Sequence, residues 1–400
     1  MGRNKMRITE LYVYPIKSLR PVSVPRTQLR REGLQYDRRF MLLKVMPDGP
    51  DGEPRYKNIQ TVFFPECTLF SQALDGDHVV VTYRVPAKPL IDPPPREQHT
   101  ALRVPLDPGV AGLDTVEIKL FGSETVAFRM GDPYDAWFTA CLGYRAVLVY
   151  IGDNRRPVLA HSPRPEPPLR QQEAKSWFSS ITTFMSSYQG KGQEVGGGEK
   201  KKEKDTSDGL AFNEAAPFLL TSKASLRDVS ARLPEGEDMD MIKFRPNIVV
   251  DDISSSESSD SEGGGEGDKT KLQAWDEDFW AELVVRDTHR LALTANCARC
   301  VSINIDYETG RPAEGERGAV LKKLMGDRRV DGGNRWSPIF GRYAFLLPRL
   351  PHTDHDDDED RKGLGENGGE EGQLVADVAV GDEVKVTRRI SERDVWAWPK

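Results

Sequence analysis

Short runs of β-branched and aromatic residues, separated by turn residues, recur along most of this chain of 400 residues. Runs at 7–14, 38–45 and 78–83 have the alternation or the β-branched content that is typical of strands. A hairpin is predicted over 116–130, with its turn at 122–123. Further strand-like runs lie at 145–151, 244–250, 281–287, 300–306 and 382–388.

Only two segments have clear helical character. Residues 135–144 follow an Asp-Pro start, and residues 221–233 follow serines that can cap a helix. In the second segment, Leu226, Val229 and Leu233 fall on one stripe. The sequence therefore predicts a mainly β fold with helical additions (α+β), in which the many short strands form barrel-like sheets.

Three polar segments, at 162–208, 252–271 and 351–374, interrupt this pattern. They are rich in Ser, Gly, Pro and charged residues, and therefore they bury too little apolar surface to offset the entropy of ordering. We expect them to be disordered, low-complexity insertions. The remaining sequence forms two candidate parts, 6–150 and 209–398, of which the second contains two of the insertions.

The insertions also dominate the formal charge, which changes from −7 for the whole chain to +3 when they are left out. A slightly basic folded part suits a small anionic ligand, and it lacks the dense Lys/Arg stripe expected for nucleic acid. No apolar run approaches the roughly 18 residues of a membrane span, and no signal-peptide core is evident. We expect a soluble intracellular protein, either cytoplasmic or associated with mitochondria.

One segment in the first insertion, 162–208, differs from its surroundings. Within 176–188, four apolar residues recur at helical spacing, namely Trp177, Ile181, Phe184 and Tyr188. A short helix that docks on its own protein explains this spacing. The alternative is a docking element for a membrane or a partner protein, and this is the one place where we expect a membrane contact.

Four cysteines, Cys67, Cys141, Cys297 and Cys300, are too few for a disulfide scaffold and are expected to be reduced. Cys297 and Cys300 form a Cys-Ala-Arg-Cys element, for which several interpretations stay open. Zinc would need a second ligand pair that the sequence does not supply. A thioredoxin-type pair would open a helix, whereas a strand is expected at 300–306. Two buried core cysteines are a third interpretation. A fourth is a metal centre, because a thiolate beside Arg299 suits a soft or high-valent metal.

Basic residues stand at the ends of several predicted strands. Lys17 and Ser18 follow the first strand, Arg38 and Arg39 begin another, and Arg245 precedes a later one. If these bases converge on one pocket, they can hold a phosphate group, Arg with two hydrogen bonds and Lys as a point charge.

The order of the motifs resembles the MOSC family, and within it the mitochondrial amidoxime-reducing components. The resemblance rests on PIKS (15–18), DRRF (37–40), APFLLTSKASL (216–226), FRPNIVV (244–250), CARCVSINIDYETG (297–310) and SPIFGRY (337–343). It covers nearly all of the chain outside the three insertions. It implies a MOSC N-terminal β-barrel-like domain followed by a MOSC β-barrel domain, with a molybdenum–molybdopterin cofactor in the cleft between them.

By this resemblance, Cys300 is the molybdenum ligand and the catalytic residue. The cofactor-binding residues that it implies are Lys17, Ser18, Arg39, Ala215, Ala216, Arg245, Asn247, Ala298, Arg299 and Tyr343. The chain departs from the family at Glu214-Ala215-Ala216, where relatives often have D-T-S or D-A-S. Backbone contacts survive this change, whereas hydroxyl contacts do not. Cys297 is expected to be a packing residue.

The resemblance implies an oxidoreductase that reduces N-hydroxylated compounds, with oxygen transfer to the molybdenum held by Cys300. Its electrons would come from a separate donor protein, such as a b-type haem protein with its reductase, because the sequence shows no flavin or nicotinamide fingerprint. A non-redox module that carries or sulfurates the cofactor is the alternative. No nucleic-acid partner is expected.

Overall fold

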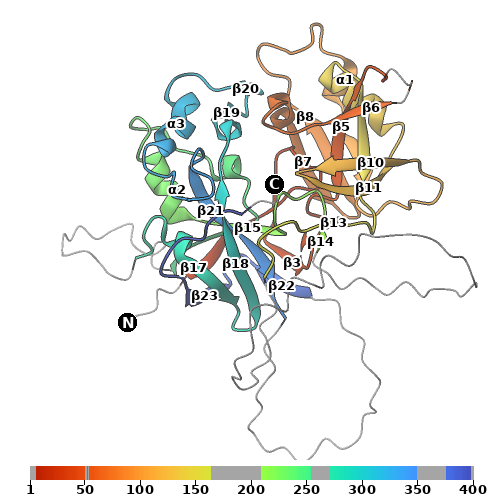
Figure 1. Cartoon of the computed structure of the whole chain (residues 1–400). Helices are drawn as coiled ribbons and strands as arrows, with labels where there is room; N and C mark the ends of the chain where they lie inside the picture. The colour runs from red at the N-terminus through yellow and green to blue at the C-terminus, as the bar shows by residue number, and fades with distance from the viewer. Residues whose placement is uncertain are drawn as a thin grey trace, which may run out of the picture. The chain divides into compact units, whose positions relative to one another are not determined.

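The structure is a computed structural model that describes residues 6–49, 52, 54–163, 209–253, 271–348 and 375–397. The described residues up to Ser162 and from Gly209 onward belong to one compact unit. Most of each predicted insertion, including the aromatic segment 176–188, lies outside the described residues. The expectation of mainly strands with few helices is confirmed (Figure 1).

The largest sheet closes on itself into a barrel, because its first strand, β16, also pairs with β1. The strands of this sheet follow the order β16 (Ile248–Asp252), β15 (Phe218–Ser222), β21 (Ile339–Leu346), β18 (His289–Ala298), β17 (Trp280–Val285), β23 (Glu383–Arg389), β1 (Met6–Val13) and β2 (Val22–Ser23). The N-terminal strand β1 therefore lies in the barrel that the C-terminal half of the chain builds. The pairing of β15 with β16 is parallel, and the other pairings of this sheet are antiparallel.

β1 shows how the sequence produces the barrel core. Its apolar residues Met6, Ile8, Leu11 and Val13 are all buried in one cluster. Ile8 and Leu11 are three residues apart, which strict alternation would place on opposite faces. A register shift between Ile8 and Glu10 in the β1–β16 pairing adds the extra residue, and so both side chains return to the same face.

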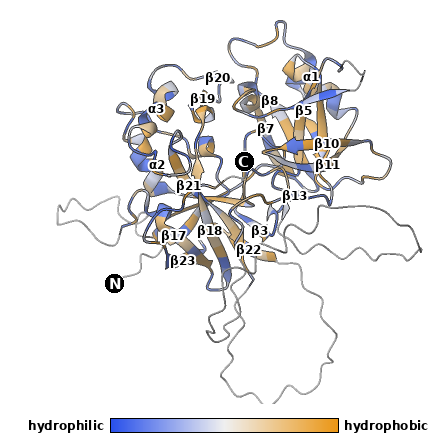
Figure 2. Cartoon of the chain, viewed as in Figure 1, coloured by the Kyte–Doolittle hydropathy of each residue, from blue (hydrophilic) through white to orange (hydrophobic). Residues whose placement is uncertain are grey.

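The middle of the N-terminal half builds two further sheets. One has the order β10 (Thr115–Leu120), β11 (Ser123–Arg129), β12 (Ala146–Tyr150), β5 (Phe40–Met46) and β6 (Arg55–Asn58), and the other β7 (Phe70–Asp75), β8 (His78–Tyr83) and β9 (Leu102–Pro105). The predicted hairpin is β10–β11, and it turns at Phe121 and Gly122. Smaller pairings are β22 (Val375–Ala379) with β3 (Arg26–Arg30) and β4 (Gly33–Leu34), β13 (Arg156–Pro157) with β14 (Gly209–Leu210), and β19 (Ile305–Asp306) with β20 (Arg311–Pro312). Figure 2 shows apolar residues concentrated on the strands of these sheets.

Both predicted helices are present, as α1 (Tyr134–Leu142) and α2 (Lys223–Ser230), together with the short α3 (Val320–Met325). Ser222 caps α2, since its side chain accepts a hydrogen bond from the backbone N–H of Ser225. The strand expected at 300–306 is largely wrong. Val301–Asn304 form a 3-10 helix, η7, and only Ile305–Asp306 are extended. The other 3-10 helices are η1 (Pro65–Leu69), η2 (Arg96–His99), η4 (Met241–Phe244), η6 (Asp276–Phe279) and η8 (Gly315–Ala319).

Candidate functional site

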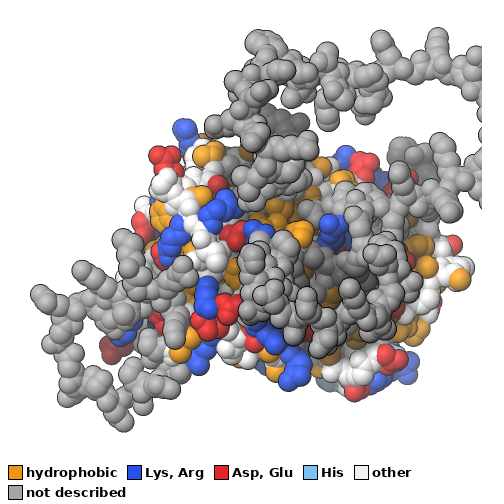
Figure 3. All heavy atoms as spheres, turned by 90° about the horizontal axis from the view of Figure 1, so that it is seen from below, with side chains coloured by type: hydrophobic (Ala, Val, Ile, Leu, Met, Phe, Trp, Pro, Cys, Tyr) orange, Lys and Arg blue, Asp and Glu red, His pale blue; other side chains and the backbone are white. Residues whose placement is uncertain are grey.

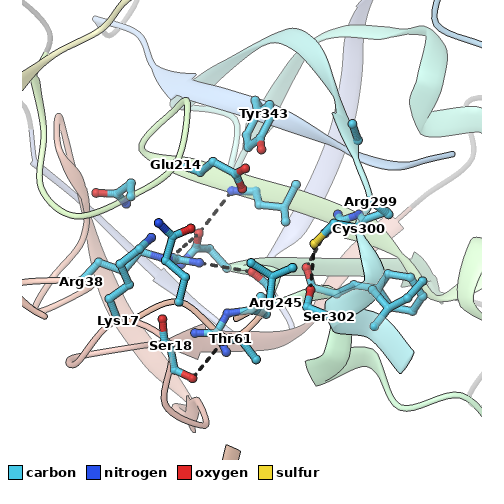
Figure 4. Close-up of a pocket in the computed structure, with 18 of the residues that line it drawn as sticks. Lys17, Ser18, Arg38, Thr61, Glu214, Arg245, Arg299, Cys300, Ser302 and Tyr343 are labelled. Carbon is cyan, nitrogen blue, oxygen red and sulfur yellow. Dashed lines mark hydrogen bonds between the residues drawn. The ribbon is translucent and has the colours of Figure 1, made fainter. Parts of the chain in front are cut away.

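A pocket of about 170 Å³ lies where strand ends and loops from both halves of the sequence meet (Figure 4). Among its walls are the ends of β1, β16 and β18 and the loop that precedes β15. Its charged lining residues are the bases Lys17, Arg38, Lys243, Arg245 and Arg299 and the carboxylate of Glu214. Because cations outnumber the carboxylate, the pocket favours an anionic ligand.

Cys300 lies on the wall of this pocket, directly after β18, and it is exposed. Arg299 fixes the segment that carries it. The backbone N–H of Arg299 donates to Pro338 O at 2.8 Å, and its guanidinium donates to Phe244 O at 2.6 Å and to Phe340 O. The Cys300 Sγ lies 3.2 Å from the hydroxyl of Ser302, which follows on η7 (Figure 4). The thiol is thus held at a rigid position and open to a ligand.

Gly341, on β21, lets the backbone pack closely against β15 and the Arg299 side chain. Its φ is +77°, and a Cβ there would lie 2.6 Å from Leu220 O and 3.5 Å from a terminal nitrogen of Arg299. A side chain at position 341 would therefore strain the backbone and push against β15.

Cys297 has the opposite environment from Cys300. It is buried in an apolar cluster with Ala215, Ala216 and Tyr343, and burial raises the pKa of its thiol to about 11. Neither cysteine of this pair forms a disulfide. Among the described residues, no group of three or more His, Cys, Asp or Glu side chains is placed to hold a metal ion.

Arg38 and Arg245 also line the pocket (Figure 4). Both guanidinium groups lie over the ring of Tyr14, at 4.6 Å and 4.5 Å from its centroid. Arg245 donates through Nη1 to Leu19 O at 3.1 Å. Its Nη2 is buried and makes no hydrogen bond of ordinary length to the described residues, while the Tyr307 side chain interacts with the same guanidinium. This donor is available to a ligand.

Lys17 is buried beside these arginines, and its Nζ donates to Phe212 O at 2.8 Å. Burial holds the pKa of Lys17 well below its ordinary value, and the positive charge of Arg38 lowers it further. An anion bound nearby would favour the charged ammonium again, because opposite charges stabilise each other. Ser18 follows Lys17 on the pocket wall and donates its hydroxyl to Ile59 O at 2.9 Å.

Most of the site residues expected from the sequence meet in this pocket. Those that line it are Lys17, Ser18, Ala216, Arg245, Asn247, Ala298, Arg299, Cys300 and Tyr343. The Asn247 side chain is used within the protein. Its Oδ1 accepts from Leu219 N and Arg38 Nη1 at 3.2 Å each, and its Nδ2 donates to Tyr12 O. Asn247 therefore joins three segments of the wall.

Two expected residues do not line the pocket. Ala215 is buried in the cluster with Cys297. Arg39 donates to Tyr150 Oη at 3.1 Å and to Gly152 O at 2.6 Å, whereas its neighbour Arg38 faces the pocket. Of the two adjacent arginines, Arg38 therefore lines the pocket and Arg39 does not. The physical reason is the φ of +52° at Arg38, which turns the chain just before β5.

Arg156 supports the site from outside the pocket, although no sequence pattern singled it out. This buried guanidinium donates to Ala211 O at 2.9 Å, Asn213 O at 2.5 Å and Glu214 O at 3.3 Å. It therefore fixes the loop before β15 that forms one wall. Burial lowers the pKa of Arg156 to about 10. Thr61 and Lys243 also line the pocket without a sequence signal.

The rest of the surface gives less specific information. In the described residues, no helix has the length and apolar character that a membrane crossing requires. Seen from below, acidic and basic side chains are mixed with apolar ones on the coloured surface (Figure 3).

Comparison with known protein families agrees with this fold and pocket. Residues 5–145 match the family model of the MOSC N-terminal beta barrel domain, and residues 207–385 match that of the MOSC domain. The chain therefore belongs to the MOSC domain proteins, as its motifs predicted.

Among characterised proteins, the chain is similar to mitochondrial amidoxime-reducing component 1 of Danio rerio, with 26% identity over 84% of this chain and 79% of that protein. The corresponding protein of Mus musculus is 28% identical over 85% of this chain and 77% of its own length. A third relative, the molybdenum cofactor sulfurase of Arabidopsis thaliana, is 30% identical over 32% of this chain and 14% of its own length. These relatives connect the chain with proteins of molybdenum-cofactor biology.

Proposed function

We propose that this protein binds a molybdenum–molybdopterin cofactor and reduces N-hydroxylated compounds. The observation that carries the proposal is the pairing, in one pocket, of the exposed Cys300 thiol with the unsatisfied Nη2 of Arg245. A thiolate is a suitable ligand for molybdenum, and an arginine with a free donor is a suitable ligand for a phosphate.

The described residues fit such a cofactor in three respects. Cys300 would hold the metal, because its sulfur is exposed and its backbone is fixed by Arg299. Lys17, Arg38 and Arg245 would neutralise the phosphate. The backbone at Ala216 and Ala298 and the buried Tyr343 would form the remaining wall.

When bound, the cofactor supplies the two-electron chemistry that removes oxygen from an N–O bond. The protein supplies the fixed geometry around it and excludes bulk water from one side. The electrons would come from a separate donor protein, for which a small b-type haem protein with its reductase is our proposal. The two similar amidoxime-reducing components are named as mitochondrial proteins, and this favours an association with mitochondria over a cytoplasmic location.

A second candidate function is cofactor sulfuration or storage without redox turnover, which the similarity to the molybdenum cofactor sulfurase favours. Two measurements on protein purified from a host that makes the cofactor separate the candidates. Molybdenum and pterin content tests binding, and reduction of benzamidoxime with reduced methyl viologen tests turnover. We expect one molybdenum per chain and turnover. Full metal content without turnover would favour storage or sulfuration, and protein without molybdenum would overturn both.

A further inference from the structure

Glu214 is the carboxylate among the described residues that line the pocket. It is exposed, and its side chain forms no hydrogen bond or ion pair with the described residues. In Figure 4 its carboxylate lies on the same side of the pocket as Tyr343, away from Ser18 and Thr61. A free carboxylate in a pocket of cations is available to a ligand that carries hydrogen-bond donors.

The backbone that carries Glu214 is rigid, although its side chain is free. Arg156 Nη2 donates to Glu214 O at 3.3 Å, and Lys17 Nζ donates to Phe212 O at 2.8 Å. Asn213 closes the loop, because its Nδ2 donates to Pro217 O and its Oδ1 accepts from Ala211 N, both at 3.1 Å. The backbone from which the carboxylate extends is therefore fixed, which supports a residue that recognises a ligand.

Charge determines which part of a ligand Glu214 can meet. A phosphate held by the bases would repel this carboxylate, because like charges at short range destabilise each other. Burial raises the pKa of Tyr343, and the negative charge of Glu214 raises it further; the same charge acts to raise the pKa values of Lys17 and Arg38. The charge of Glu214 therefore acts both on these bases and on Tyr343, and in Figure 4 the carboxylate itself lies on the Tyr343 side of the pocket. This is where a substrate would have to approach.

The chemistry of N–O reduction supplies the matching donor. An N-hydroxyamidine takes up two electrons and two protons, loses its hydroxyl oxygen as water and becomes an amidine. Both compounds carry an amino group, and the amidine is a strong base that gains a further proton at neutral pH. A carboxylate that accepts a hydrogen bond from this amino group binds more strongly as the positive charge develops, which favours the reaction.

We propose that Glu214 is a specificity-determining residue that accepts a hydrogen bond from the amino group of N-hydroxyamidines. The inference rests on the proposed function and adds a preference within it. Substrates whose reduced product is a cationic base are favoured over equally sized substrates with a carbonyl oxygen at the same position. A carboxylate repels that oxygen, because both atoms are acceptors.

The test uses two substrates that differ at this position, benzamidoxime with an amino group and benzhydroxamic acid with a carbonyl oxygen. In Glu214→Gln the charge is lost, and the new amide N–H can donate to the carbonyl. We expect the ratio of kcat/KM for benzamidoxime to that for benzhydroxamic acid to fall about tenfold or more. In Glu214→Asp the charge is kept, and we expect kcat/KM to remain higher for benzamidoxime than for benzhydroxamic acid.

Product binding and cofactor content provide independent readouts. We expect molybdenum-loaded Glu214→Gln to bind benzamidine about tenfold more weakly than the wild-type protein by calorimetry. An equal loss of kcat/KM for both substrates, together with a lower pterin content, would show that Glu214 holds the cofactor and would overturn the inference. An unchanged ratio with wild-type benzamidine affinity would also overturn it. A wild-type protein that reduces neither substrate would overturn the proposed function itself.

Discussion

Arg38 and Arg245 lie 207 positions apart in the sequence, yet Arg38 Nη2 donates a hydrogen bond to Arg245 O at 3.3 Å. Their guanidinium groups share the ring of Tyr14, which is fully buried between them. Two cations this close repel each other, and the buried Asp37 beside Arg38 compensates for only part of that charge. A bound anion would complete the compensation, which is why this pair marks the proposed phosphate site.

The first prediction concerns Arg245→Ala. The variant loses the unsatisfied Nη2 donor, and we expect cofactor binding to weaken by about 1.5–3 kcal/mol, the range of a charge-assisted hydrogen bond. The measurement is pterin and molybdenum content after dialysis. Arg39→Ala is the matched control, because the Arg39 guanidinium is bound to Tyr150 and Gly152 outside the pocket. Full occupancy in Arg245→Ala, or an equal loss in both variants, would contradict the assignment.

The second prediction concerns Arg156→Ala and stability. The substitution leaves several backbone carbonyls without their buried donor, and we expect the free energy of unfolding to fall by about 3 kcal/mol or more. Arg103→Ala removes an arginine that is paired with Asp75 at the surface, and it should cost about 1 kcal/mol or less. Urea denaturation of both variants checks the difference. Equal losses in the two variants would mean that the Arg156 contacts do not hold the loop.

The third prediction concerns Glu277 and the pH dependence of stability. Burial raises the pKa of Glu277 from its ordinary value of 4.5 to about 7, and one of its oxygens lacks a hydrogen-bond partner among the described residues. The folded protein therefore holds this proton more tightly than the unfolded chain does. The contribution of Glu277 to stability is greatest below pH 4.5, declines as the pH rises towards 7 and stays at its lowest value above that pH.

Glu277→Gln removes this titration. We expect the variant and the wild-type protein to have similar free energies of unfolding at pH 4.5, and the variant to be more stable at pH 8 by about 3 kcal/mol. Urea denaturation at the two pH values is the measurement. The same difference at both pH values would show that Glu277 does not titrate in this range.

The sequence predicted much of the fold because the responsible signals are local. The alternation in 7–14 and the serine before 223–230 depend on a few neighbouring residues, and both elements form as expected. The segment after Cys300 was harder, since Val301 and Ile303 look like alternating strand residues. The structure instead buries Ile303 against the α3 residues Val320 and Leu324, and tertiary packing of this kind overrides the local pattern.

A site residue could be predicted from the sequence where it lies in a recognisable motif. The motifs predicted Cys300, Arg245 and Lys17 as site residues, and the structure places all three in one pocket. Whether Arg38 or Arg39 lines the pocket depends on a left-handed backbone conformation at Arg38, which no sequence pattern predicts. Arg156 was missed because it binds the backbone carbonyl groups of residues 120, 211, 213 and 214. Every residue has such a carbonyl group, and therefore no sequence motif marks these contacts.

The metal content of two cysteine variants tests the central claim most directly. Cys300 is exposed in the pocket, whereas Cys297 is buried in an apolar cluster, so that only Cys300 is placed to bind a metal. A serine hydroxyl is a harder and less acidic donor than a thiol. We predict that Cys300→Ser, purified from a host that makes the cofactor, loses its molybdenum and its turnover, and that Cys297→Ser keeps most of both. Equal metal content in the two folded variants, whether kept or lost, would contradict the assignment of Cys300 as the molybdenum ligand.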